Sequence, residues 1–159
     1  MGAAAVTLRA AGDADVPAIV ALVNAAFAVE RAFVDRDRTN ADEIAGMLRK
    51  GTFLVADGDA GALLAAMYLE RRGPHAYLGM LSIQPSQQGR GLGRAMMAAA
   101  ESHARAWGCD AIDIRILHLR TELPPFYLAL GFVETGRTET VNDPFSRKPY
   151  HFILMTKAL

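Results

Sequence analysis

The sequence has little cysteine, no excess of either charge and no long apolar run, and each absence excludes a class of protein. Its 159 residues include one cysteine, so no internal disulfide can form and nothing speaks against a reducing cytoplasm. Basic and acidic side chains both number 17, so no broad basic field attracts nucleic acid. No apolar run reaches the ~18 residues of a membrane span. We therefore expect a cytoplasmic protein with no nucleic-acid or membrane partner.

Signals for targeting, metal binding and covalent catalysis are also scarce. The segment MGAAAVTLRA lacks a basic flank before a long apolar core, so we do not expect a signal peptide. The four histidines are scattered, with no H-x-x-x-H or clustered carboxylates, so no metal site is predicted. Cys109 precedes a predicted strand with no histidine near it in sequence, and it is expected to be a buried small residue.

Periodicity and turn signals predict one domain, residues 1–159, with seven strands and four helices and no internal repeat. The expected strands are 6–10, 53–56, 62–70, 76–83, 111–119, 132–141 and 150–157. The expected helices follow caps at Asp13 or Asp15 and at Thr39 or Asn40, and occupy 92–107 and 121–131. Strands 76–83 and 111–119 must be parallel because a whole helix crosses between them, whereas the earlier strands are expected to be antiparallel.

The most informative stretch is 78–94, LGMLSIQPSQQGRGLGR, in which an apolar strand stops at Pro85 and a helix begins after three glycines. Gly89, Gly91 and Gly93 carry no side chains to shield their backbone N–H groups. The following helix adds unpaired N–H groups and the positive end of its dipole. This arrangement is typical of an anion site, most often for phosphate, although an ordinary strand-to-helix turn would also use such glycines.

Two nucleotide-binding motifs fit this loop poorly. A Walker A loop needs Gly-Lys-Ser/Thr, but Gly93 is followed by Arg94 and Ala95. The dinucleotide fingerprint G-x-G-x-x-G meets Arg94 where its third glycine belongs. A nucleotide-dependent enzyme is therefore a weak alternative.

The spacing Gln88-x-x-Gly91-x-Gly93 resembles the Q/R-x-x-G-x-G/A signature of the GCN5-related N-acetyltransferase (GNAT) superfamily. Residues 119–132, LRTELPPFYLALGF, resemble that family's "FY...GF" helix, so two separate motifs cover roughly the central third of the chain. The resemblance implies a mixed α/β (α+β) fold of GNAT type. This fold has a central, mostly antiparallel twisted sheet of about seven strands with a parallel splayed pair, flanked by about four helices.

The resemblance also implies acetyl-CoA as cosubstrate, bound where the two parallel strands splay apart. Pantetheine would bind the backbone of one strand, and the pyrophosphate would bind the loop and helix N-terminus. The residues at the matching positions are Leu81, Ser82, Ile83, Gln88, Gly89, Arg90, Gly91, Leu92, Gly93 and Arg94.

Transfer from a thioester to an amine requires no covalent intermediate, which suits a chain without an activated nucleophile. The backbone near Leu81 or Ser82 could donate an N–H to the thioester oxygen as it gains charge. The resemblance places Tyr127 as the general acid that protonates the CoA sulfur. The family usually has an asparagine that makes a polar contact to CoA at the position of Arg120. Whether Arg120 makes this contact is left open.

Candidate bases and the acceptor are less defined by the sequence. Glu70 and His118, at the ends of their strands, rank ahead of His75 as bases. The acceptor is expected to be a primary amine of a small molecule or peptide. Loops 30–39 and 142–149 carry both signs of charge, so neither polyamines nor acidic acceptors are selected. A non-catalytic acyl-CoA-binding regulatory module is the alternative function, and the closing strands are of a sort that often pairs across a homodimer.

Overall fold

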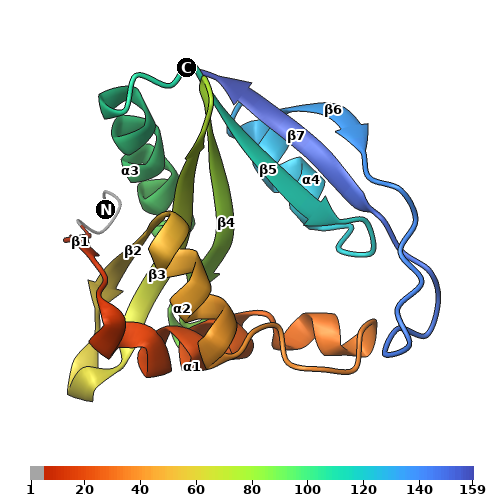
Figure 1. The fold of residues 1–159 in the computed structure, drawn as a ribbon, viewed down its shortest axis with the longest axis horizontal. Coiled ribbons are helices and arrows are strands. Elements are labelled where there is room, and N and C mark those ends of the chain that lie inside the picture. The colour runs from red at the N-terminus through yellow and green to blue at the C-terminus, as the bar shows by residue number, and fades with distance from the viewer. Residues whose placement is uncertain (1–5) are drawn as a thin grey trace.

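Seven strands form a single sheet in the computed structural model, which describes residues 6–159 (Figure 1). The strands are β1 (Arg9–Ala10), β2 (Thr52–Asp57), β3 (Leu63–Arg72), β4 (His75–Ile83), β5 (Ala111–Leu117), β6 (Val133–Arg137) and β7 (Phe152–Ala158). Their order is β1-β2-β3-β4-β5-β7-β6, and all neighbours are antiparallel except β4 and β5, which are parallel. This confirms the predicted fold class.

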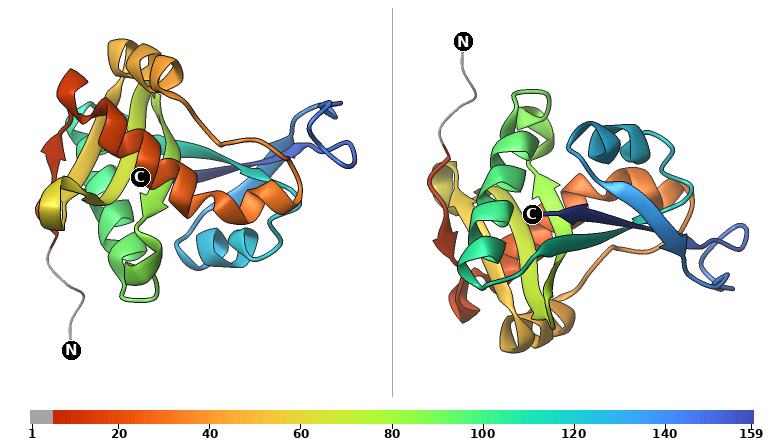
Figure 2. Two further views of the ribbon diagram at one scale, coloured as in Figure 1. Left: turned by 90° about the horizontal axis from the view of Figure 1, so that it is seen from below. Right: turned by 90° about the horizontal axis from the view of Figure 1, so that it is seen from above.

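Helices cover both faces of the sheet. They are α1 (Val16–Ala26), α2 (Ala41–Lys50), α3 (Leu92–Ala106) and α4 (Leu123–Ala129). Figure 2 shows α1 and α2 on one face, with α3 and α4 on the other. Asn40 caps α2 as expected, since its side chain accepts a hydrogen bond from the Glu43 N–H. A hydrophobic core lies between each face and its helices. One core surrounds Ile19, Ile44 and Phe53, and the other surrounds Met96.

Some element details differ from the sequence prediction. The first strand is short, Arg9–Ala10 rather than 6–10, and α3 ends at Ala106 rather than at 107. The buried residues of α3 include Met96, Ala100 and Ala104, which repeat every fourth position. The alanines let the helix approach the sheet closely. The segment 1–5, part of the predicted non-signal N-terminus, lies outside the described residues.

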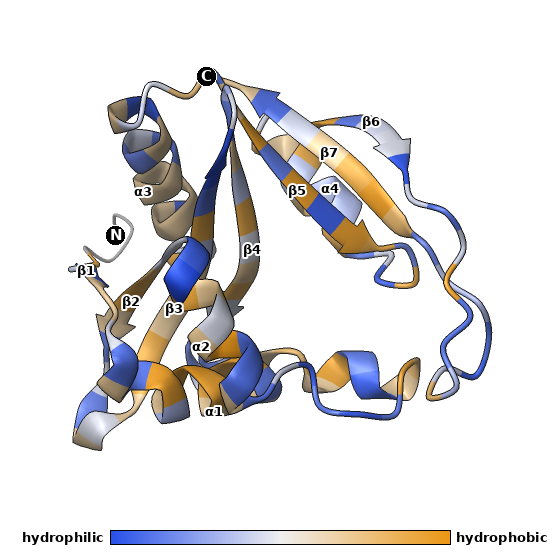
Figure 3. Ribbon diagram, in the orientation of Figure 1, coloured by the Kyte–Doolittle hydropathy of each residue, from blue (hydrophilic) through white to orange (hydrophobic). Residues whose placement is uncertain are grey.

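The sheet opens into a triangular frame at its centre (Figure 1). β4 and β5 diverge from a common apex, and a short helix, η2 (Ala28–Ala32), with the chain that follows it forms the third side. That side meets the β6–β7 connection, where the Asp35 N–H donates to the Phe145 carbonyl (2.8 Å) and Arg36 pairs with Asp143 (2.6 Å). Figure 3 shows hydrophobic residues along the strands and mostly hydrophilic ones in that connection. Within 6–159, no helix is long and apolar enough to cross a membrane.

Candidate active site

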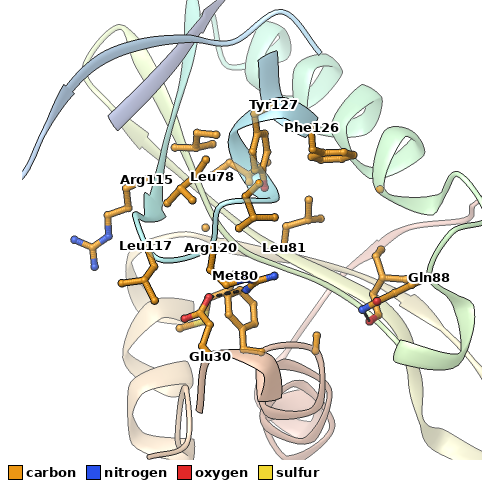
Figure 4. Close-up of a pocket in the computed structure, with 18 of the residues that line it drawn as sticks. Glu30, Leu78, Met80, Leu81, Gln88, Arg115, Leu117, Arg120, Phe126 and Tyr127 are labelled. Atoms are coloured by element: carbon orange, nitrogen blue, oxygen red, sulfur yellow. Dashed lines mark hydrogen bonds and ion pairs between the residues drawn. The ribbon is translucent and has the colours of Figure 1, made fainter. Parts of the chain in front are cut away.

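A cavity of about 500 Å³ lies between the diverging strands (Figure 4). The parallel ladder joins β4 to β5 only at three residue pairs, from His75–Ala111 to Tyr77–Asp113. Beyond Tyr77, the edge of β4 that faces β5 is left without a strand partner. Ligands bind in this position in open sheets, at the carboxyl ends of the strands.

A β-bulge in β4 accounts for the divergence. The pairing of β3 with β4 shifts register between Ala66–Ser82 and Tyr68–Gly79, and Met80 in the bulge has φ +50°. A bulge bends its strand and increases the local twist, which carries β4 away from β5. A non-glycine residue in the left-handed region is strained, and it persists only where surrounding packing holds it. Met80 itself is buried and lines the cavity wall.

The glycine-rich loop forms one end of the cavity. Gly89 and Gly91 both have φ +80°, which favours glycine, and Gly91 precedes α3 with no side-chain cap. The first N–H groups of this 15-residue helix therefore keep their hydrogen-bonding capacity for a ligand. A Cβ built on Gly93 would lie 3.4 Å from the Phe126 ring, so a side chain would fill the space beside the loop. The loop thus fits a diphosphate.

The structure brings most of the predicted cofactor-binding residues to this cavity. Those that line it are Leu81, Ile83, Gln88, Gly89, Gly91, Leu92, Gly93 and Arg94. Gln88 also closes the loop onto the strand, with its side-chain amide donating to the Ile83 carbonyl (3.4 Å). Ser82 and Arg90 do not line it. The Ser82 hydroxyl is buried and donates to the Met80 carbonyl (3.0 Å), and Arg90 is exposed at the loop tip.

Tyr127 lies on α4 beside Phe126 and lines the cavity between the loop and Arg115 (Figure 4). Its ring is held edge-on by Phe126 and Phe132, with centroids 5.0 and 5.5 Å away. Within the described part of the chain, its hydroxyl has no hydrogen-bond partner, so it is available to a ligand. Burial raises the pKa of Tyr127 to about 12, so the phenol keeps its proton at neutral pH.

The raised pKa of Tyr127 predicts a specific alkaline sensitivity. Above about pH 10 an unfolded chain loses this phenolic proton, whereas the folded chain holds it until about pH 12. The free energy of unfolding should therefore fall by about 2–3 kcal/mol across this interval on account of Tyr127. Tyr68 and Tyr150 also have raised pKa values and destabilise both proteins equally at high pH. Between about pH 9 and about pH 12, urea unfolding should therefore show a decrease that is smaller by this amount in Tyr127→Phe than in the wild type. Equal decreases in both proteins would contradict the assigned pKa.

Glu30 and Arg120 form an ion pair across the cavity that the sequence analysis did not foresee. The Arg120 Nη1 atom lies 2.8 Å from Glu30 Oε2, and both side chains are mostly buried. Arg120 also pairs with Glu122, and these hydrogen bonds raise its pKa although burial alone would lower it. The pair joins η2 to the β5–α4 connection, which are 90 residues apart in the chain.

The predicted bases lie outside the cavity lining. The Glu70 carboxylate accepts the Tyr68 hydroxyl (2.6 Å) and pairs with Arg72, and these hydrogen bonds lower the pKa of Glu70. His118 stacks on His151 and accepts the His151 N–H at Nδ1 (3.1 Å). His75 lies at the apex, 2.8 Å from Asp113. A base role for any of them stays a prediction.

Comparison with known proteins agrees with this geometry. The model of the acetyltransferase (GNAT) family matches residues 18–132. Mycothiol acetyltransferase from Beutenbergia cavernae is 42% identical over 83 residues, which are 50% of this chain and 27% of that protein. The chain thus spans about a quarter of that relative's length.

Two solved structures share the fold. Ribosomal-protein-alanine N-acetyltransferase from Brucella melitensis has a TM-score of 0.74 at 22% identity, covering 96% of this chain and 99% of that one. A Salmonella typhimurium protein solved with its cofactor acetyl-CoA has a TM-score of 0.72 at 24% identity, covering 98% and 95%. The family match includes both the glycine-rich loop and the helix that carries Tyr127, and the chain therefore belongs to the acetyltransferase (GNAT) family.

Proposed function

We propose that the protein is an N-acetyltransferase that moves the acetyl group of acetyl-CoA to a primary amine. The observation that carries this proposal is one cavity that is lined both by the uncovered loop amides and by the Tyr127 phenol. A family neighbour solved with its cofactor acetyl-CoA supports the choice of cosubstrate. The mycothiol and ribosomal-protein-alanine acetyltransferases support acetyl transfer as the reaction class.

In this proposal the chain binds the coenzyme through its backbone. The amides from Gln88 to Arg94 would hold the diphosphate, with Arg94 and Arg90 adding charge-assisted contacts. The free edge of β4 from Leu81 through Ser82 to Ile83 would hold the pantetheine amides. Bound acetyl-CoA would supply the thioester that is broken in the reaction.

The reaction replaces a C–S bond by a C–N bond, so the amine nitrogen loses a proton and the leaving sulfur gains one. Tyr127 is the proposed general acid, because its hydroxyl lines the cavity, is protonated at neutral pH and bonds to no other group among the described residues. A strand N–H near Leu81 or Ser82 would stabilise charge on the carbonyl oxygen. Glu70 or His118 would accept the amine proton through water, since neither lines the cavity.

A binding assay and a transfer assay together test this function. We expect acetyl-CoA to raise the melting temperature and ATP or NAD to leave it unchanged. A panel of amines incubated with acetyl-CoA should release free CoA, which a thiol reagent detects. Stabilisation by acetyl-CoA without release from any amine would instead indicate a non-catalytic acyl-CoA-binding module, and stabilisation by ATP or NAD alone would indicate a nucleotide-dependent enzyme.

The proposal also includes a cellular location and an oligomeric state. A cytoplasmic location agrees with the single cysteine, Cys109, which is buried. A homodimer would be formed through the closing strands, of which β6 is the edge strand of the sheet. Cell fractionation and light scattering test these two features.

A further inference from the structure

A second cavity of about 550 Å³ adjoins the coenzyme cavity. Its outer wall comes from residues 34–43 and from the β6–β7 connection. The two cavities share a seam, which consists of Phe27, Glu30, Arg38, Arg115, Leu117 and Phe152. If the first cavity holds acetyl-CoA, the second is the adjacent space in which an acceptor can reach the thioester.

Most charges around the second cavity are cancelled by partners within the protein. Arg36 pairs with Asp143, whose side chain is only 5% exposed. Glu30 pairs with Arg120 (2.8 Å). The net charge that a ligand meets in the second cavity therefore depends on its other charged side chains.

One arginine on the seam, Arg115, is not cancelled in this way, and a second, Arg38, is only partly cancelled. Throughout residues 6–159, no carboxylate lies within ion-pair distance of Arg115, and its guanidinium lies over the Phe152 ring, 4.4 Å from the centroid. The Arg38 guanidinium lies 3.8 Å from the Glu43 carboxylate, which also accepts a hydrogen bond from the Thr39 hydroxyl. The Arg38 guanidinium also lies 5.3 Å from the centroid of the Phe27 ring.

Stacking on an aromatic ring fixes a guanidinium while leaving its N–H edge free. That edge matches the two oxygens of a carboxylate. Figure 4 shows the Arg115 guanidinium pointing away from Tyr127, on the side of β5 remote from the phenol. An anion bound there would leave the rest of the same molecule free to extend toward the reacting centre.

Resting on the proposed function, we infer that the acceptor is an amine that also carries a carboxylate, as an amino acid does, and that Arg115 binds this carboxylate. Arg38 adds a second positive charge. Polyamines meet uncancelled positive charge here and are poor acceptors.

The test compares amino acids with their carboxamides, which keep the amine and side chain but lack the negative charge. CoA release is measured for each matched pair from the twenty protein amino acids. The wild type should show kcat/KM at least about tenfold higher for the carboxylate member of the accepted pair. Arg115→Gln should bring this ratio close to one, mainly through a higher KM for the carboxylate. Arg38→Gln should lower it less, because Glu43 already offsets part of that charge.

Arg49→Gln is the matched control, because Arg49 is exposed on α2 and lines neither cavity; its ratio should equal that of the wild type. Transfer to carboxamides as efficient as to carboxylates, or an unchanged ratio in Arg115→Gln, overturns the acceptor inference while leaving acetyl transfer intact. CoA release from no amine at all, with acetyl-CoA binding retained, overturns the proposed function and the inference with it. Melting temperatures confirm that each variant is folded.

Discussion

Replacing Tyr127 by phenylalanine should lower kcat for acetyl transfer by about a hundredfold or more and leave the Kd for acetyl-CoA within about twofold. The phenylalanine ring keeps the edge-on packing against Phe126 and Phe132 and removes only the hydroxyl. If Tyr127 is the general acid, as proposed, the leaving sulfur then departs without its proton donor. Steady-state kinetics give kcat, and calorimetry gives the Kd.

Tyr68→Phe is the comparison variant, because the Tyr68 hydroxyl lies outside the cavity lining and bonds to Glu70, one of the two proposed bases. Melting temperatures of both variants measure what the loss of each hydroxyl costs in stability. A fall in kcat in Tyr68→Phe with an unchanged melting temperature would point to Glu70 as the base. An unchanged kcat in Tyr127→Phe would show that the sulfur leaves without this acid.

Replacing Gly91 by valine should raise the Kd for acetyl-CoA on the order of a hundredfold, by displacing amides that each contribute ~1.5–3 kcal/mol to holding a charged diphosphate. Gly91 has φ +80°, where a β-branched residue is strongly disfavoured, and it sets the direction of the first α3 amides. Titration calorimetry with acetyl-CoA measures the effect.

Gly108→Val is the control, since Gly108 has the same φ of +80° just beyond the other end of α3 and lines neither cavity. Both variants should lose about 1–2 kcal/mol of stability from the strained backbone. Only Gly91→Val should lose acetyl-CoA affinity. Equal affinities in the two variants would argue against the loop as the diphosphate site.

The loop and the Tyr127 helix could be predicted because their signals are local. Glycines, a proline stop and an apolar repeat define a strand, a bare turn and a helix within about twenty residues. The parallel pairing of β4 with β5 followed from the crossing helix alone. The number and order of elements were therefore predicted well, and only their ends shifted.

The remaining features depend on contacts distant in sequence. The β4 bulge arises where β4 pairs with β3, and methionine at position 80 gives no sign of a left-handed residue. The charges of 30–39 looked balanced, but the partners of Glu30 and Arg36 are Arg120 and Asp143, far along the chain. Glu70 was predicted as a base because of its position at the end of a strand. Its hydrogen bond with the Tyr68 hydroxyl could not be predicted, because it forms only in the folded sheet.

The closed triangular frame has a consequence for which thioesters the protein can use. The gap between β4 and β5 is tied at the apex by three residue pairs and at the base by the contacts of Asp35 and Arg36. Widening this gap breaks one of these ties. If acetyl-CoA binds as proposed, we expect extra carbons on a longer acyl chain to extend across the seam and occupy the acceptor's own space. Long acyl donors would then compete with the amine.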